Sequence, residues 1–111
     1  MESLRAKIEA VWSDRSLLKT PGYPEAVKEV VRLLDVGELR VASPPSDEGG
    51  AWSVHAWVKQ AVLLFFGVSG METIEVGPFE YHDKVPLKTG YKEAGVRVVP
   101  PATVRHGAHV E

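Results

Sequence analysis

The stretch Pro24-Glu-Ala-Val-Lys-Glu-Val-Val-Arg-Leu-Leu-Asp-Val36 decides the helical half of the fold. Its apolar side chains recur at helical spacing and predict an amphipathic helix with one buried face. These side chains are Val27, Val30, Val31 and Leu34. Pro24 suits the first turn, because the N–H that proline lacks is not needed there. Gly37 is expected to end the helix.

Two further segments predict helices on either side of this one. Residues 2–13 carry apolar side chains at helical spacing, namely Leu4, Ile8, Val11 and Trp12. Thr20-Pro-Gly22 then breaks the chain. The segment 55–66 fits a helix through Trp57, Ala61, Leu64 and Phe65, and a buried strand is the alternative. Its length and its unbranched leucines favour the helix.

The remaining segments predict short strands. Residues 39–42 are extended in character, the polar stretch 43–50 is a loop, and residues 51–54 are expected to pair back as a hairpin. Alternating side chains predict further strands at 73–76, 79–81 and 95–99. The aromatic pair Trp52 and Trp57 and the nearby His55 are expected to cover the core. The predicted fold class is therefore α+β, a small domain of helices followed by short strands.

The end of the chain has a different pattern. Val104 and Val110 are six residues apart, with the small Ala108 between them. That spacing is typical of a coil of a parallel β-helix, in which each face buries one aliphatic side chain. We therefore expect a domain at residues 1–101 and the start of a hexapeptide-repeat β-helix at residues 102–111. One coil cannot bury its own face, so the natural chain is expected to continue and residues 104–111 to fray.

Composition excludes several classes of protein and site. The chain has 111 residues, a net charge of -2 and no cysteine, so disulfides, thiolate nucleophiles and zinc–cysteine sites are excluded. A binder of nucleic-acid phosphates would normally be basic, and none is expected here. The longest apolar run, Ala61–Phe66, is far too short to span a membrane, and the N-terminus resembles no secretory signal. We expect a soluble, cytoplasmic protein.

Histidines do not form a convincing catalytic or metal site. His106 and His109 have a spacing that would suit a metal on a helix, but their segment is predicted to be extended and no carboxylate cluster accompanies them. His82 and Asp83 are neighbours in a predicted strand, so their side chains should point to opposite faces. No metal site is predicted.

The basic residues are the more informative polar group. Five of them lie on predicted extended or loop segments, namely Arg40, Lys84, Lys88, Arg97 and Arg105. Arginine and lysine there would suit carboxylates or phosphates, and a solvated surface is the alternative. Their spacing alone does not choose between the two interpretations.

Four segments, in order, resemble the tetrahydrodipicolinate N-succinyltransferase family. They are Leu33-Leu-Asp-Val-Gly-Glu-Leu-Arg-Val-Ala42, Trp52-Ser-Val-His-Ala-Trp-Val-Lys-Gln-Ala-Val-Leu-Leu-Phe65, Tyr81-His-Asp-Lys-Val-Pro-Leu-Lys88 and Val96-Arg-Val-Val-Pro-Pro-Ala-Thr-Val-Arg-His-Gly-Ala108. The chain departs from the family pattern at His82, at His109 and in a shorter stretch at 89–94. The resemblance is loose before Pro24 and close from Leu33 onward.

The resemblance implies an enzyme of the diaminopimelate route to lysine. Such an enzyme transfers succinyl from the co-substrate succinyl-CoA to the amino group of a ring-opened dicarboxylate acceptor, with no bound cofactor. The family implies an N-terminal domain, a left-handed β-helix and assembly as a homotrimer. Its catalytic residues lie in the β-helix, so the resemblance places none of them in this chain.

One residue role follows from the resemblance. Arg97, in Val96-Arg-Val-Val-Pro-Pro101, matches the arginine that binds the acceptor in the family. Lys84, Lys88 and Arg105 remain possible anion contacts. The alternative function is a stand-alone binding or assembly module that derives from the enzyme and has no catalytic activity.

Overall fold

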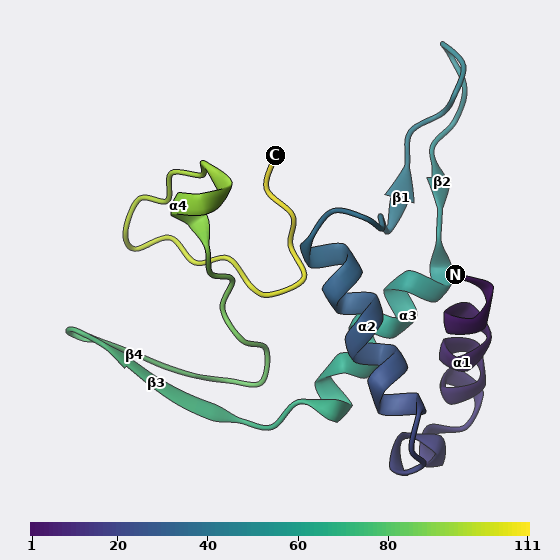
Figure 1. Cartoon of the computed structure of the whole chain (residues 1–111), viewed down its shortest axis with the longest axis horizontal. Coiled ribbons are helices and arrows are strands. Elements are labelled where there is room, and N and C mark those ends of the chain that lie inside the picture. The colour runs from purple at the N-terminus through teal and green to yellow at the C-terminus, as the bar shows by residue number, and fades with distance from the viewer.

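The computed structural model describes all 111 residues. Helices occupy one side of the molecule, and a β-hairpin with a short helix occupies the other (Figure 1). The elements in chain order are α1 (Glu2–Ser13), η1 (Arg15–Lys19), α2 (Tyr23–Asp35), β1 (Ala42–Ser43), β2 (Ser53–Val54), α3 (Ala56–Val68), β3 (Glu72–Val76), β4 (Phe79–Asp83) and α4 (Tyr91–Ala94). The α+β class predicted from the sequence is confirmed.

The hydrophobic core lies among α1, α2 and α3. The three predicted helices are confirmed, and the ambiguous segment after His55 is helix α3. The predicted apolar faces of α2 and α3 are buried, and Leu64 from α3 is 1% exposed. On α1, Ile8 and Val11 are fully buried, whereas Leu4 and Trp12 are half-buried at the edge of the core. Packing of these side chains is what holds the helices together, because helices of this length are marginal in isolation.

Helix α2 begins and ends as its sequence predicts. The Glu25 carboxylate accepts a hydrogen bond of 2.8 Å from the Gly22 N–H. A hydrogen bond with its own main chain and this bond from Gly22 lower the pKa of Glu25. At the other end, Gly37 has φ of +80°, a conformation that suits glycine. The helix therefore starts one residue before the predicted Pro24 and ends one residue before Val36.

The strands β1 and β2 form the predicted hairpin in a shortened form. Ala42 pairs with Val54, and Ser43 pairs with Ser53. A hydrogen bond of 2.8 Å between Ser43 Oγ and His55 Nε2 closes the base of this hairpin. The expectation for the two tryptophans is half right. Trp57 on α3 is buried, whereas Trp52 is 60% exposed because the hairpin carries it away from the helices.

The strands β3 and β4 pair in antiparallel register and extend from the helices as an arm (Figure 1). Ile74 lies opposite Tyr81, and both are half-buried. Glu75 lies opposite Glu80 on the outer face, and both are exposed. The two strands predicted here are confirmed.

The strand predicted at 95–99 is wrong. This segment follows α4 and Gly95, whose φ is +72°, and no other strand pairs with it. The predicted alternation nevertheless survives in the side chains, because Val96 and Val98 are half-buried and Arg97 is exposed. A segment can be extended without becoming a strand when it has no partner for its main-chain groups.

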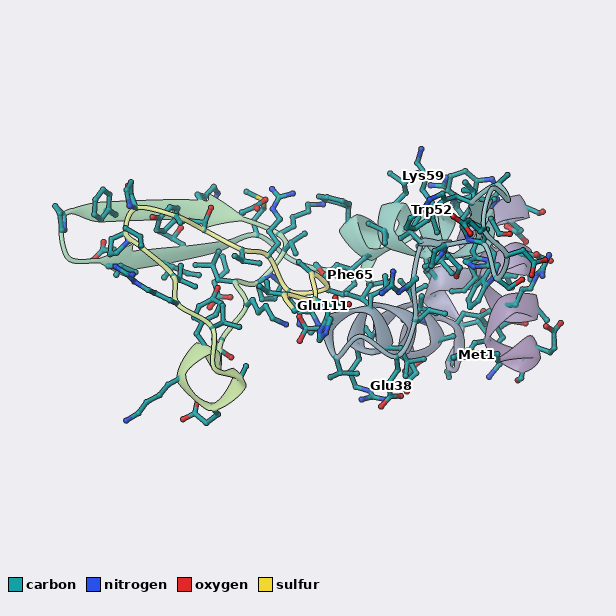
Figure 2. All side chains as sticks on the ribbon, turned by 90° about the horizontal axis from the view of Figure 1, so that it is seen from above. Met1, Glu38, Trp52, Lys59, Phe65 and Glu111 are labelled. Atoms are coloured by element: carbon teal, nitrogen blue, oxygen red, sulfur yellow. The ribbon has the colours of Figure 1, made fainter.

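The molecule is flat and expanded. Its extents are 43 × 43 × 20 Å and its radius of gyration is 16.0 Å, against about 13 Å for a compact domain of this length. Figure 2 shows the labelled C-terminal residue Glu111 between the arm of β3 and β4 and the helices. No helix is long and apolar enough to cross a membrane.

Candidate functional site

The main chain around Arg97 forms a loop with a closed neck. The N–H of Lys88 donates to the carbonyl of Val104 at 2.8 Å, and the N–H of His106 donates to the carbonyl of Pro86 at the same distance. We call residues 88–104 the Arg97 loop. Loops whose ends lie close together are frequently functional. These bonds tie Val104 and His106 to the chain before the loop, and the expectation that residues 104–111 fray stays a prediction.

Arg97 lies on the exposed side of this loop. It makes no hydrogen bond and no salt bridge within the chain. Val96 and Val98 on either side are half-buried, and Val98 lines a cavity that it shares with Val76 and Phe79 of the hairpin of β3 and β4. The guanidinium is therefore free to bind an anion from solvent.

A cavity of about 270 Å³ lies on the inner side of the Arg97 loop. Its lining is mostly apolar and joins the arm to the loop, and it includes Val76, Phe79, Tyr81, Tyr91, Val98 and Pro101. Arg97 itself does not line this cavity. The cavity is the space between the loop and the arm that supports it.

Lys88, at the start of the loop, forms an ion pair with the last residue of α2. Its Nζ donates to Asp35 Oδ1 at 2.8 Å and to the Asp35 carbonyl at 3.0 Å. The two side chains are only 12% and 20% exposed. Burial raises the pKa of Asp35, but hydrogen bonds from Lys88 and the Gly107 N–H, together with the nearby His106, outweigh it and hold the pKa below its ordinary value.

Arg105 is also paired within the chain. Its Nη2 lies 2.7 Å from Asp83 Oδ2, and its guanidinium carbon lies 5.9 Å from the centre of the Phe66 ring. A hydrogen bond from the Lys84 N–H lowers the pKa of Asp83, burial opposes the shift, and Arg105 adds to it. The Lys84 ammonium donates to the carbonyl of Phe66 at 3.1 Å.

The structure therefore does not gather the predicted cations around one site. Lys84, Lys88 and Arg105 contact groups of the protein, and Arg97 alone faces solvent without a partner. Arg40 pairs with Glu111 at 3.1 Å on the surface. Sequence reasoning missed Asp35, although an acid at a helix C-terminus is unfavourable with the helix dipole and should have drawn attention to it.

The histidines hold no metal cluster. No group of three or more potential ligands comes together. The ring of His109 lies against Gly37, and His106 Nδ1 lies 3.5 Å from Asp35. His82 hydrogen-bonds to Thr73 across the arm at 2.7 Å and not to its neighbour Asp83.

Residues 3–68 match the family model described as tetrahydrodipicolinate N-succinyltransferase N-terminal. This match covers more than half of the chain. The chain belongs to that family. The part of the chain that matches the N-succinyltransferase family runs through α1, α2 and α3, and it ends just before β3.

Curated relatives extend the N-succinyltransferase similarity over nearly the whole chain. The 2,3,4,5-tetrahydropyridine-2,6-dicarboxylate N-succinyltransferase of Variovorax paradoxus is 39% identical over 98% of this chain, and that of Aeromonas salmonicida is 41% identical over 99%. The enzyme of Paracidovorax citrulli is 41% identical over 98%. In each case the chain spans only 42–43% of the relative's length.

The candidate residues lie outside the part that matches the N-succinyltransferase domain model. Lys84, Lys88, Arg97 and Arg105 all follow residue 68. They fall within the span that aligns with the full-length relatives. Asp35 is the one site residue that lies within the matched domain, and it contacts the later segment through Lys88.

Proposed function

We propose that the chain is the N-terminal part of a succinyl-CoA-dependent tetrahydrodipicolinate N-succinyltransferase in diaminopimelate and lysine biosynthesis. In this proposal the domain contributes Arg97 to binding of the dicarboxylate acceptor. The observation that carries it is that Arg97 is exposed and unpaired, whereas the other predicted cations contact protein groups. A free guanidinium on a tethered loop suits an anionic ligand.

The chemistry of the acceptor favours an arginine at this point. A planar guanidinium bonds both oxygens of one carboxylate at once, which a lysine cannot do. The neighbouring Val96 and Val98 are half-buried, and we propose that they limit the freedom of the main chain at Arg97, so that little freedom is lost when the ligand binds. We propose that Lys84, Lys88 and Arg105 hold the segment in place, and that Arg97 makes the ligand contact.

We propose that the catalytic groups lie in the part of the protein that follows this domain. Acyl transfer from a thioester needs a base for the attacking amine and donors for the oxyanion. We propose that both are supplied by a left-handed β-helix that begins at residues 102–111, in a cytoplasmic homotrimer. The difference in length supports this proposal, since the relatives are more than twice as long as this chain.

The test of this function is Arg97→Ala in the full-length protein that carries the domain. We expect a loss of about 1.5–3 kcal/mol of acceptor binding, the range for a hydrogen bond to a charged group, or roughly a 10- to 150-fold rise in acceptor KM. The KM for succinyl-CoA should hardly change. Lys92→Ala, an exposed cation in the same loop, is the matched control.

Two results would contradict the proposal. An unchanged acceptor KM and kcat in a folded Arg97→Ala variant would leave Arg97 without a role in the site. A natural gene product that stops at Glu111 and binds partners without turnover would favour the stand-alone module. The mass of the native protein and a coupled succinyl transfer assay decide between the enzyme and the module.

A further inference from the structure

We infer that Asp35 and Lys88 are positioning residues for Arg97, which fix the neck of the Arg97 loop to the end of α2. The inference rests on the proposed function, because it concerns how Arg97 is presented to the acceptor. Asp35 and Lys88 do not contact the ligand in this inference. They act through the main chain of the loop.

Lys88 contributes to the neck in two ways. Its main-chain N–H donates to the carbonyl of Val104, which closes the loop. Its side chain reaches α2 and donates both to the Asp35 carboxylate and to the Asp35 carbonyl. The residue that closes the loop is therefore the same residue that fastens it to the helix.

The other side of the neck is fastened to the same carboxylate. The Gly107 N–H donates to Asp35 Oδ1 at 2.9 Å. A side chain at Gly107 would meet Val31 of α2 at 3.1 Å, and φ at this glycine is +106°. Lys88 on one side of the neck and Gly107 on the other thus bond the same oxygen of Asp35. The segment at Gly107 also lies directly against α2.

The helix is a rigid base for this attachment. Val31 and Leu34, one turn and one residue before Asp35, are buried in the core. An acidic residue in the last turn of a helix is unfavourable with the helix dipole, so Asp35 does not stabilise α2 by itself. All its recorded side-chain partners belong to the segments at the neck, namely Lys88, His106 and Gly107.

The exposed pair Arg32 and Glu29 provides a matched control. It lies on the same helix, with 2.8 Å between Arg32 Nη2 and Glu29 Oε1. Both residues belong to α2, so this pair fastens nothing to the loop. Loss of this pair should leave acceptor binding unchanged.

The test is a double-mutant cycle with Lys88→Met and Arg97→Ala in the full-length protein. We expect Lys88→Met to raise the acceptor KM about tenfold to a hundredfold, the scale for a misplaced binding group, and to leave the succinyl-CoA KM unchanged. Adding Lys88→Met to Arg97→Ala should cause little further rise. Lys88→Arg should restore most of the acceptor binding, and Arg32→Gln should behave like the parent protein.

The outcomes separate the two claims. If Arg97→Ala leaves the acceptor KM unchanged, the proposed function fails. If Arg97→Ala raises it while Lys88→Met has no effect, or an equal effect in both backgrounds, only the positioning role fails. Should Lys88→Met fail to fold, Asp35→Asn replaces it in the cycle, because asparagine keeps an acceptor oxygen and removes the charge. Hydrogen exchange of the α2 amides checks folding in each variant.

Discussion

The ammonium of Lys88 and the carboxylate of Asp35 lie 2.8 Å apart although 53 positions separate them in the chain. This pair connects the end of α2 with the start of the Arg97 loop. Because both side chains are largely buried, removing either partner leaves a charge with poor access to water. Loss of the pair should therefore destabilise the fold, and it should also release the start of the Arg97 loop from the end of α2.

The stability of the domain should depend on the ionisation of Asp35. Its pKa in the folded protein is below the ordinary value of 3.8, despite burial, because Lys88, Gly107 and His106 favour the carboxylate. The ionised Asp35 carboxylate stabilises the fold at pH values above its ordinary pKa. This contribution is lost as the pH falls through the lowered pKa of the folded state. Asp35→Asn should cost about 1.5–3 kcal/mol near neutral pH, the range for a hydrogen bond to a charged group, and progressively less as the pH falls below the ordinary pKa of Asp35. Urea unfolding of both proteins from pH 2 to pH 7 measures the difference, and a difference that grows toward low pH would contradict the assignment.

Gly107→Ala should destabilise the attachment of the C-terminal segment. The φ of +106° is strained for alanine, and its Cβ would lie 3.1 Å from Val31 Cγ1. We expect a loss of about 1–3 kcal/mol in the free energy of unfolding. Gly49→Ala is the control, because Gly49 also has positive φ, at +83°, and an added Cβ there meets nothing within 4 Å. Equal losses at both positions would mean that the contact with α2 adds nothing.

Two adjacent leucines on α3 should respond very differently to truncation. Leu64 is 1% exposed in the core, and Leu63 is 48% exposed on the outer face. Leu64→Ala should cost about 2–5 kcal/mol through lost contacts and the cavity that remains. Leu63→Ala should stay within about 0.5 kcal/mol of the parent. Chemical denaturation compares them, and a large loss at Leu63 would indicate that its face is covered in solution.

Hydrogen exchange should show where the end of the chain is held. The amides of Lys88, His106 and Gly107 donate within the protein and should exchange slowly. The amides of Val110 and Glu111 have no acceptor in the chain and should exchange at once. Uniform fast exchange from Val104 onward would show that the neck is open most of the time.

The sequence predicted most of the helices and the arm because their signals are local. The faces of α1, α2 and α3 follow from residue spacing within a few turns, and the alternation in β3 and β4 lies within one hairpin. The strand at 95–99 was wrong for a related reason. Its alternation is real, but a strand also needs a neighbour, and sequence spacing does not supply one.

The candidate site also has features that the sequence indicated and features that only the structure shows. Arg97 came from a resemblance to a family and not from its spacing, and its exposure is a result of the structure. The partners of Lys88 and Arg105 could not be predicted, because they lie 53 and 22 positions away in the chain. Spacing therefore left every cation as an equal candidate, whereas the tertiary contacts leave only one of the five, Arg97, without a partner.

The internal pairing of these cations also affects how an anion would approach. Around the loop, the Arg105 charge is balanced by Asp83 and the Lys88 charge by Asp35, in a protein whose net charge is -2. The exposed cations of the loop that have no carboxylate partner are Arg97 and Lys92, and salt screens their attraction within about 8 Å under physiological conditions. Because few charges attract it, a dianionic ligand should associate with this domain at a rate that falls only modestly as ionic strength rises, and selection of the ligand takes place mainly after contact.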